Sequence, residues 1–157
     1  MTPVIGSEIV TDRRYAELRC LVEVRRCCSH PAEWLTAAVL VHFIVSIVHG
    51  AAHGGAHVRL SPMAALYVLV VIVAGPLIGL ALMRSGHRIG SWVIALTLAG
   101  SLAFGVAYHF VLANPDHVAH VDPHWRRSFA TTAGLLAVTE ALGCVLAIHV
   151  AGREKPS

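Results

Sequence analysis

Four long apolar stretches, separated by short polar connections, dominate the chain. They cover residues 34–54, 62–83, 89–113 and 128–150. About 20 apolar residues in a helix cross a bilayer core, so each stretch is long enough to span a membrane, whereas a β-barrel strand is about half as long. The pattern predicts an all-α integral membrane protein, a four-helix bundle over residues 31–152 whose helices run up-down-up-down. A head of residues 1–30 precedes it, and a tail of residues 153–157 follows.

Local signals mark where the helices begin. Ser61–Pro62 and Asp122–Pro123 each combine an N-capping side chain with a proline at the first helical position. Gly75–Pro76 lies inside the second stretch and predicts a kink there. Asn114–Pro115 could cap a short surface helix between the third and fourth stretches. The fourth helix is therefore expected to start in water before it enters lipid.

Composition supports a membrane protein and excludes several other classes. Hydrophobic residues make up 56% of the chain and charged residues only 13%, about half the usual share for a soluble domain. So much apolar side chain with so little polar surface excludes a disordered chain, a nucleic-acid-binding domain and an ordinary water-soluble fold. The four Cys residues show no metal-ribbon spacing. The expected partner is the lipid bilayer, and a homo-oligomer or a further membrane subunit stays open.

Basic residues indicate the direction of insertion. Nine of the 12 Lys and Arg residues fall in the head, the second connection and the tail. The three on the opposite side are Arg59, Arg126 and Arg127. Because positive charge stays in the cytoplasm, we expect both termini inside, in a bacterial inner (cell) membrane. The head itself is either a basic cytoplasmic segment, interfacial or disordered, or the product of an over-extended gene start.

Histidine is unusually frequent, and its positions are not random. Of the 11 His residues, seven gather at the expected outer end: His49, His53, His57, His109, His117, His120 and His124. Asp116 and Asp122 fall on the same side. His49 and His53 are one helical turn apart on one face, and His109 lies at a similar depth in the third span. Imidazole and carboxylate are the usual ligands of Zn, Cu and Fe.

The clustered ligands predict a transition-metal site at the extracytoplasmic end, serving metal binding, trafficking or redox chemistry. We expect His49, His53 and His109 as its core ligands, because they lie inside the bundle where helices hold them rigidly. Outer ligands are expected from the connection before the fourth span: His117, His120 and Asp116. Gly50 follows His49 where a zinc protease has Glu, so protease chemistry is not favoured. Whether the protein is an enzyme stays open.

Two ionisable residues lie deep in the expected membrane core. Glu140 is about 12 residues, or roughly 18 Å, into the fourth span, and His42 is about as deep when counted from the outer end of the first. An ionisable group in hydrocarbon usually faces the bundle interior and has a partner there. We therefore expect His42 and Glu140 to face each other, either as a proton relay or ligand pair or as a structural hydrogen bond.

Two family resemblances and one simpler interpretation compete with a metal site. Four spans with His49 and His109 at matched depths resemble cytochrome b561-type proteins, which implies a single bis-His haem b between those residues. The clustered histidines also resemble the boxes of membrane desaturases and hydroxylases, although His117 and His120 lack the adjacent His of that pattern. Both resemblances cover isolated residues only. In the simplest interpretation, a structural subunit without cofactor places amphipathic His rings at the interface.

Overall fold

The computed structural model describes residues 30–153, and this part of the chain is helical, without strands. The spans belong to one compact unit, Ala32–Ser157. Residues 1–29 and 154–157 lie outside the described residues, so most of the expected head and tail is not described. Four helices are long and apolar enough to cross a membrane, which confirms the all-helical bundle that the apolar pattern predicts.

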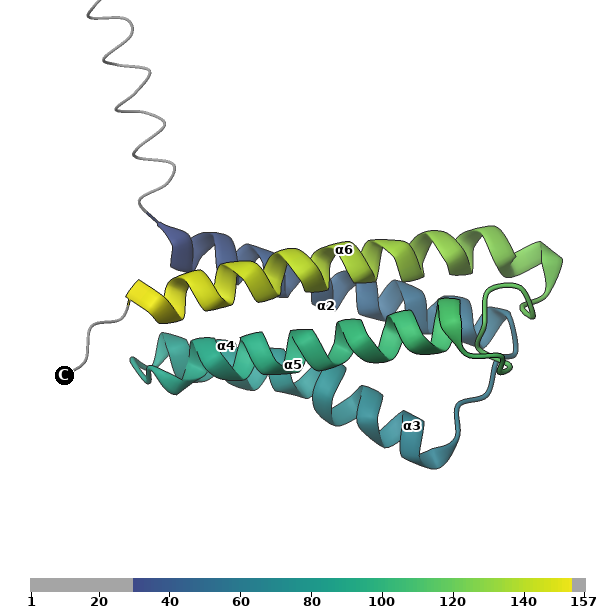
Figure 1. Ribbon diagram of the computed structural model, residues 1–157, viewed down its shortest axis with the longest axis horizontal. Helices are drawn as coiled ribbons and strands as arrows, with labels where there is room; N and C mark the ends of the chain where they lie inside the picture. Colours follow the sequence, from purple (N-terminus) through teal and green to yellow (C-terminus); the bar gives the residue numbers. More distant parts are fainter. Residues whose placement is uncertain (1–29, 154–157) are drawn as a thin grey trace, which may run out of the picture. The chain divides into compact units, whose positions relative to one another are not determined.

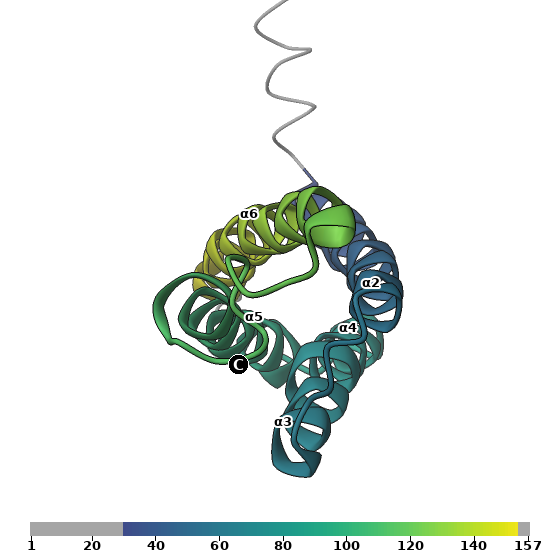
Figure 2. The ribbon, with the colours of Figure 1, turned by 90° about the vertical axis from the view of Figure 1, so that its right-hand side faces the viewer.

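The four spans are built from continuous and interrupted helices (Figure 1). The first is α2 (Pro31–Gly55) and the fourth is α6 (Pro123–Arg153). Within the second, α3 (Pro62–Tyr67) continues through the π-helical segment η1 (Val68–Ala74) into α4 (Gly75–Arg84). The third joins α5 (Ile89–Val106) to a shorter π-helical segment, η2 (Ala107–Val111). Seen end-on, α2, α4, α5 and α6 surround a common centre, and α3 diverges from it (Figure 2).

Helix starts follow the sequence signals, but the short surface helix expected after Asn114 is wrong. Ser61 caps α3 by accepting a hydrogen bond from the Ala64 amide at 3.2 Å. Residues 112–122 instead form turns. The Asn114 Oδ1 atom accepts a hydrogen bond from the Asp116 backbone N–H at 2.7 Å. Such a local hydrogen bond competes with helix formation. The Val118 amide donates to the His109 carbonyl at 3.0 Å, which ties this connection to the end of η2.

The second span widens just before its proline. Pro76 has no N–H, so the carbonyl of Ile72, four residues earlier, lacks its usual helical donor. The π-helical segment η1 ends at Ala74, immediately before the expected Gly75–Pro76 kink. A freed carbonyl inside an apolar helix bundle needs a donor from another residue. His42 supplies it, because its Nε2 lies 3.1 Å from the Ile72 oxygen.

The apolar core lies between α2, α5 and α6. Its buried members come from all three helices: Leu35, Val39, Ile94, Ala95, Leu98, Ala147 and Val150. Large apolar side chains also cover the outside, among them Leu40, Ile44 and Ile47 of α2. A helix that is apolar on both sides is typical of a membrane span. The exposed apolar surface is therefore compatible with contact to lipid.

Gly90 lets α4 and α5 approach closely. A Cβ built at Gly90 would lie 2.6 Å from the Gly79 carbonyl oxygen and 2.8 Å from the Met83 Cα, and these backbone atoms cannot move aside easily. Gly90→Ala is therefore expected to lower the free energy of unfolding by about 1–3 kcal/mol through overpacking. Gly134→Ala, where the new Cβ meets nothing within 4 Å, is the matched control. Equal denaturation midpoints for both variants in detergent would contradict this prediction.

Candidate metal centre

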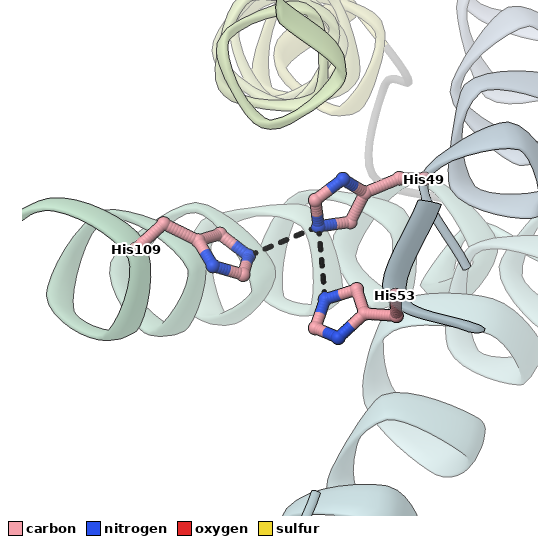
Figure 3. Close-up of side chains that lie close together, drawn as sticks. All are labelled: His49, His53 and His109. Carbon is pink, nitrogen blue, oxygen red and sulfur yellow. Dashed lines mark hydrogen bonds between the residues drawn. The ribbon is translucent and has the colours of Figure 1, made fainter. Parts of the chain in front are cut away.

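Three histidines from two spans converge at one end of the bundle. His49 and His53 lie one turn apart near the end of α2, and His109 lies in η2. The Nε2 atom of His49 is 3.2 Å from His109 Nε2 and 3.2 Å from His53 Nε2 (Figure 3). One ligand atom of each residue lies within 4.8 Å of the other two. The three residues expected as core ligands are thus neighbours in the fold.

The spacing of these nitrogens suits a tetrahedral metal ion. Zn–N bonds are 2.0–2.1 Å, so two nitrogens on a tetrahedral ion lie about 3.3 Å apart. Two of the three nitrogen pairs in this cluster are separated by 3.2 Å. The cluster therefore could hold a metal ion.

A buried carboxylate completes the group. Asp116 is only 4% exposed, because the turn that starts at Asn114 brings it against the end of η2. Its Oδ1 lies 3.3 Å from His53 Nε2, and its Oδ2 lies 3.6 Å from His109 Nδ1. Neither oxygen accepts a hydrogen bond from any residue that the structure describes. A buried anion without donors is costly, and a bound cation would neutralise it.

Hydrogen bonds on the far side of two rings fix where the protons lie. His109 Nδ1 faces the Asp116 carbonyl oxygen at 3.2 Å, so this nitrogen donates and the Nε2 atom carries the lone pair. The Thr132 hydroxyl lies 2.9 Å from the Ser128 carbonyl, to which it donates. It can therefore accept from His49 Nδ1, 2.8 Å away. Such partners are typical of metal-binding imidazoles, because they select the tautomer with a free Nε2.

An aromatic ring packs against all three imidazoles. Phe129 of α6 is fully buried, and its ring centroid lies 4.9 Å from that of His49, 4.8 Å from that of His53 and 5.2 Å from that of His109. Packed aromatic neighbours restrict the rotation of each imidazole. The sequence shows Phe129 and Thr132 only as ordinary members of an apolar span, so their role could not be inferred from spacing.

The remaining outer histidines do not join this cluster. His117 and His120 contact each other, with ring centroids 5.3 Å apart, and His120 Nδ1 lies 2.7 Å from the Asn114 carbonyl. His57 and His124 are exposed. The structure thus places Asp116 beside the cluster of His49, His53 and His109, but does not bring His117 or His120 into that cluster.

A cavity of about 210 Å³ begins at the cluster and extends into the bundle. His49, His53, His109 and Asp116 line one part, and Ser101 and Glu140 line another. Between them the walls are mostly apolar, with side chains such as Val73, Phe104 and Leu136. Glu140 also lies near His42, since Nδ1 and Oε1 are 4.0 Å apart. The two deep ionisable residues are thus neighbours, as their depth predicts.

Thr132 offers a test of the tautomer argument. Thr132→Val removes the acceptor of the His49 Nδ1 proton, so metal affinity is expected to fall about 10-fold, the lower end of the effect of such outer partners. Thr132→Ser keeps the hydroxyl and should bind normally. Thr139→Val is the control, because Thr139 lies about two turns further along α6 and its hydroxyl bonds, among the described residues, only to the Leu136 carbonyl of its own helix. Equal affinities for both valine variants in a chelator-competition titration would contradict the assignment.

The fold and the cluster together define the class. The chain has four helices long and apolar enough to cross a membrane, and a histidine cluster that could bind a metal ion. Comparison with family models, curated proteins and solved structures found no match. The function is therefore argued from the site itself.

Proposed function

We propose that this protein binds one transition-metal ion through His49, His53 and His109, with Asp116 as the fourth ligand. The observation that carries the proposal is the convergence of three imidazole nitrogens beside a buried carboxylate that has no hydrogen-bond donor within residues 30–153. Three nitrogens and one oxygen in a tetrahedral arrangement favour Zn²⁺, and Cu or Fe are the other candidates. A site closed by four protein ligands suits metal capture or transfer better than catalysis at an open position.

The facing nitrogens need a cation between them. The outer hydrogen bonds of His49 and His109 leave a lone pair on each Nε2, and these two atoms are 3.2 Å apart. Two lone pairs at this distance repel each other in a water-poor site. A metal ion turns the repulsion into two bonds. A single proton could also bridge the two nitrogens, but both Asp116 oxygens would then still have no hydrogen-bond donor among the described residues.

A small ion suits the site better than haem. A bis-His haem between His49 and His109 would place its flat macrocycle across the line that joins the two Nε2 atoms. His53 Nε2 lies 3.2 Å from His49 Nε2, and Asp116 Oδ1 lies 3.3 Å from His53 Nε2. These atoms fill the space that the macrocycle needs.

The test is the metal content of the detergent-purified protein, measured together with its visible spectrum. We expect about one Zn, Cu or Fe per chain and no Soret band, with metal occupancy falling in acid as protons compete for the imidazole nitrogens. A Soret band would establish the haem alternative. No bound metal after loading with each ion in turn would leave the histidines as interfacial side chains, and the proposal would fail.

The side of the membrane on which the site opens follows from charge. With nine basic residues on one side and three on the other, we propose that the termini are cytoplasmic and the metal site is extracytoplasmic. A reporter that is active only in the cytoplasm is expected to be active when it is fused after Ser157. A periplasmic signal from that fusion would move the histidine cluster to the cytoplasmic side and would contradict capture of metal from outside.

A further inference from the structure

A second polar pair lies deeper in the bundle than the metal site. His42 of α2 is 1% exposed and Glu140 of α6 is 2% exposed. His42 Nδ1 lies 4.0 Å from Glu140 Oε1, and this nitrogen has no hydrogen-bond partner among residues 30–153. An ionisable group at membrane depth with an unused polar atom indicates a functional site.

The proline of the second span sets the tautomer of His42. Because Pro76 cannot donate to the Ile72 carbonyl, that oxygen accepts from His42 Nε2 at 3.1 Å. The Nε2 atom therefore carries the proton of the neutral ring. The Nδ1 atom then presents a lone pair toward Glu140.

Glu140 also presents an acceptor. The Ser101 hydroxyl donates to its Oε1, so both groups that face each other are acceptors unless a proton lies on one of them. A buried carboxylate without a cation is costly, and the usual response is to take up a proton. The pair therefore has room for one proton, carried by Glu140 and within a small side-chain rotation of His42 Nδ1.

The pair and the metal site share one cavity. Glu140 and Ser101 line it together with the titratable groups His49, His53, His109 and Asp116. Gly105 lies between the two sites, because a Cβ built there would be 4.0 Å from both Glu140 Oε2 and His109 Cδ2. A charge at the histidine cluster and a charge on Glu140 therefore interact strongly, because little water separates them.

We propose that His42 and Glu140 form a proton-binding site whose proton leaves when a divalent cation binds at the histidine cluster. A divalent ion with the single negative charge of Asp116 leaves one positive charge buried in the bundle. Loss of one proton from Glu140 supplies the second negative charge and makes the site neutral, which buried sites favour. The exchange is one metal ion in and one proton out, and it rests on the metal binding proposed above.

Infrared spectroscopy of the metal-free protein tests the proton site by itself. At about pH 7 we expect the C=O stretch of one protonated carboxylic acid that disappears in Glu140→Gln and is unchanged in Thr139→Val. His42→Leu should shift this band, since the acid loses the imidazole lone pair that it faces at 4.0 Å. That shift tests the proton site if Glu140→Gln does not fold. No acid band that depends on Glu140 or His42 would overturn the proton site, whether or not metal binds.

Metal titration in weak buffer tests the exchange. With Zn²⁺ added to the detergent-purified protein at about pH 7, we expect the Glu140→Gln variant to release about one proton fewer per bound ion than the unmodified protein or Thr139→Val. The number of ions bound should stay the same in all three. Equal proton release in all three would overturn the coupling, and loss of a second bound ion in Glu140→Gln would show a metal site in place of a proton site. If the unmodified protein binds no metal, the proposed function fails, and the infrared result still decides the proton site.

Discussion

Changing His49, His53 and His109 to Ala together is expected to remove the bound metal completely, from about one ion per chain to none. The reason is that these residues supply three of the four proposed ligands, and one ring nitrogen of each lies within 4.8 Å of the other two. Asp116 alone cannot retain a transition metal, since rigid convergence of several ligands is what a specific site needs. Elemental analysis of the purified variant, after loading with excess ion and dialysis, gives the measurement.

The matched control replaces three exposed histidines, His57, His87 and His124. It removes the same number of imidazoles and should keep the full metal content. Both triple variants should reach the membrane in equal amounts, because alanine is at least as compatible with lipid as histidine. Retention of metal by the first variant, or equal loss in both, would mean that binding comes from scattered surface imidazoles.

The fold is largely readable from the sequence, because a membrane span needs little beyond length and apolar composition. Ser61 and Asp122 also mark two helix starts, since Pro62 and Pro123 are the first residues of α3 and α6. The connection after Asn114 is not readable in this way. Its turns depend on the Asn114 side chain and on a bond back to His109, and neither has a periodic signal.

Part of the candidate site can also be predicted from the sequence, because depth and spacing along a span follow from residue positions alone. Equal depth and one-turn spacing single out His49, His53 and His109, and depth alone pairs His42 with Glu140. Rotation of each helix about its axis is set by packing, however, and spacing does not report it. Thr132 therefore looks like any threonine in a span, although its hydroxyl is 2.8 Å from His49 Nδ1.

Asp116→Asn is expected to change metal affinity and the stability of the metal-free protein in opposite directions. With metal absent, the buried carboxylate has no hydrogen-bond donor among the described residues, so removing its charge should leave the melting temperature equal or raise it. With metal present, the variant loses an anionic ligand 3.3 Å from His53 Nε2.

We expect metal affinity to fall about 100-fold, or roughly 2.7 kcal/mol, so the rise in melting temperature on adding Zn²⁺ should shrink accordingly. Asn keeps the shape of the side chain, which separates charge from packing. The measurements are melting curves with and without metal, together with a chelator-competition titration. Unchanged affinity would show that Asp116 is not a ligand. Equal destabilisation of the metal-free and metal-bound forms would instead show that this carboxylate only stabilises the 112–122 connection and does not bind metal.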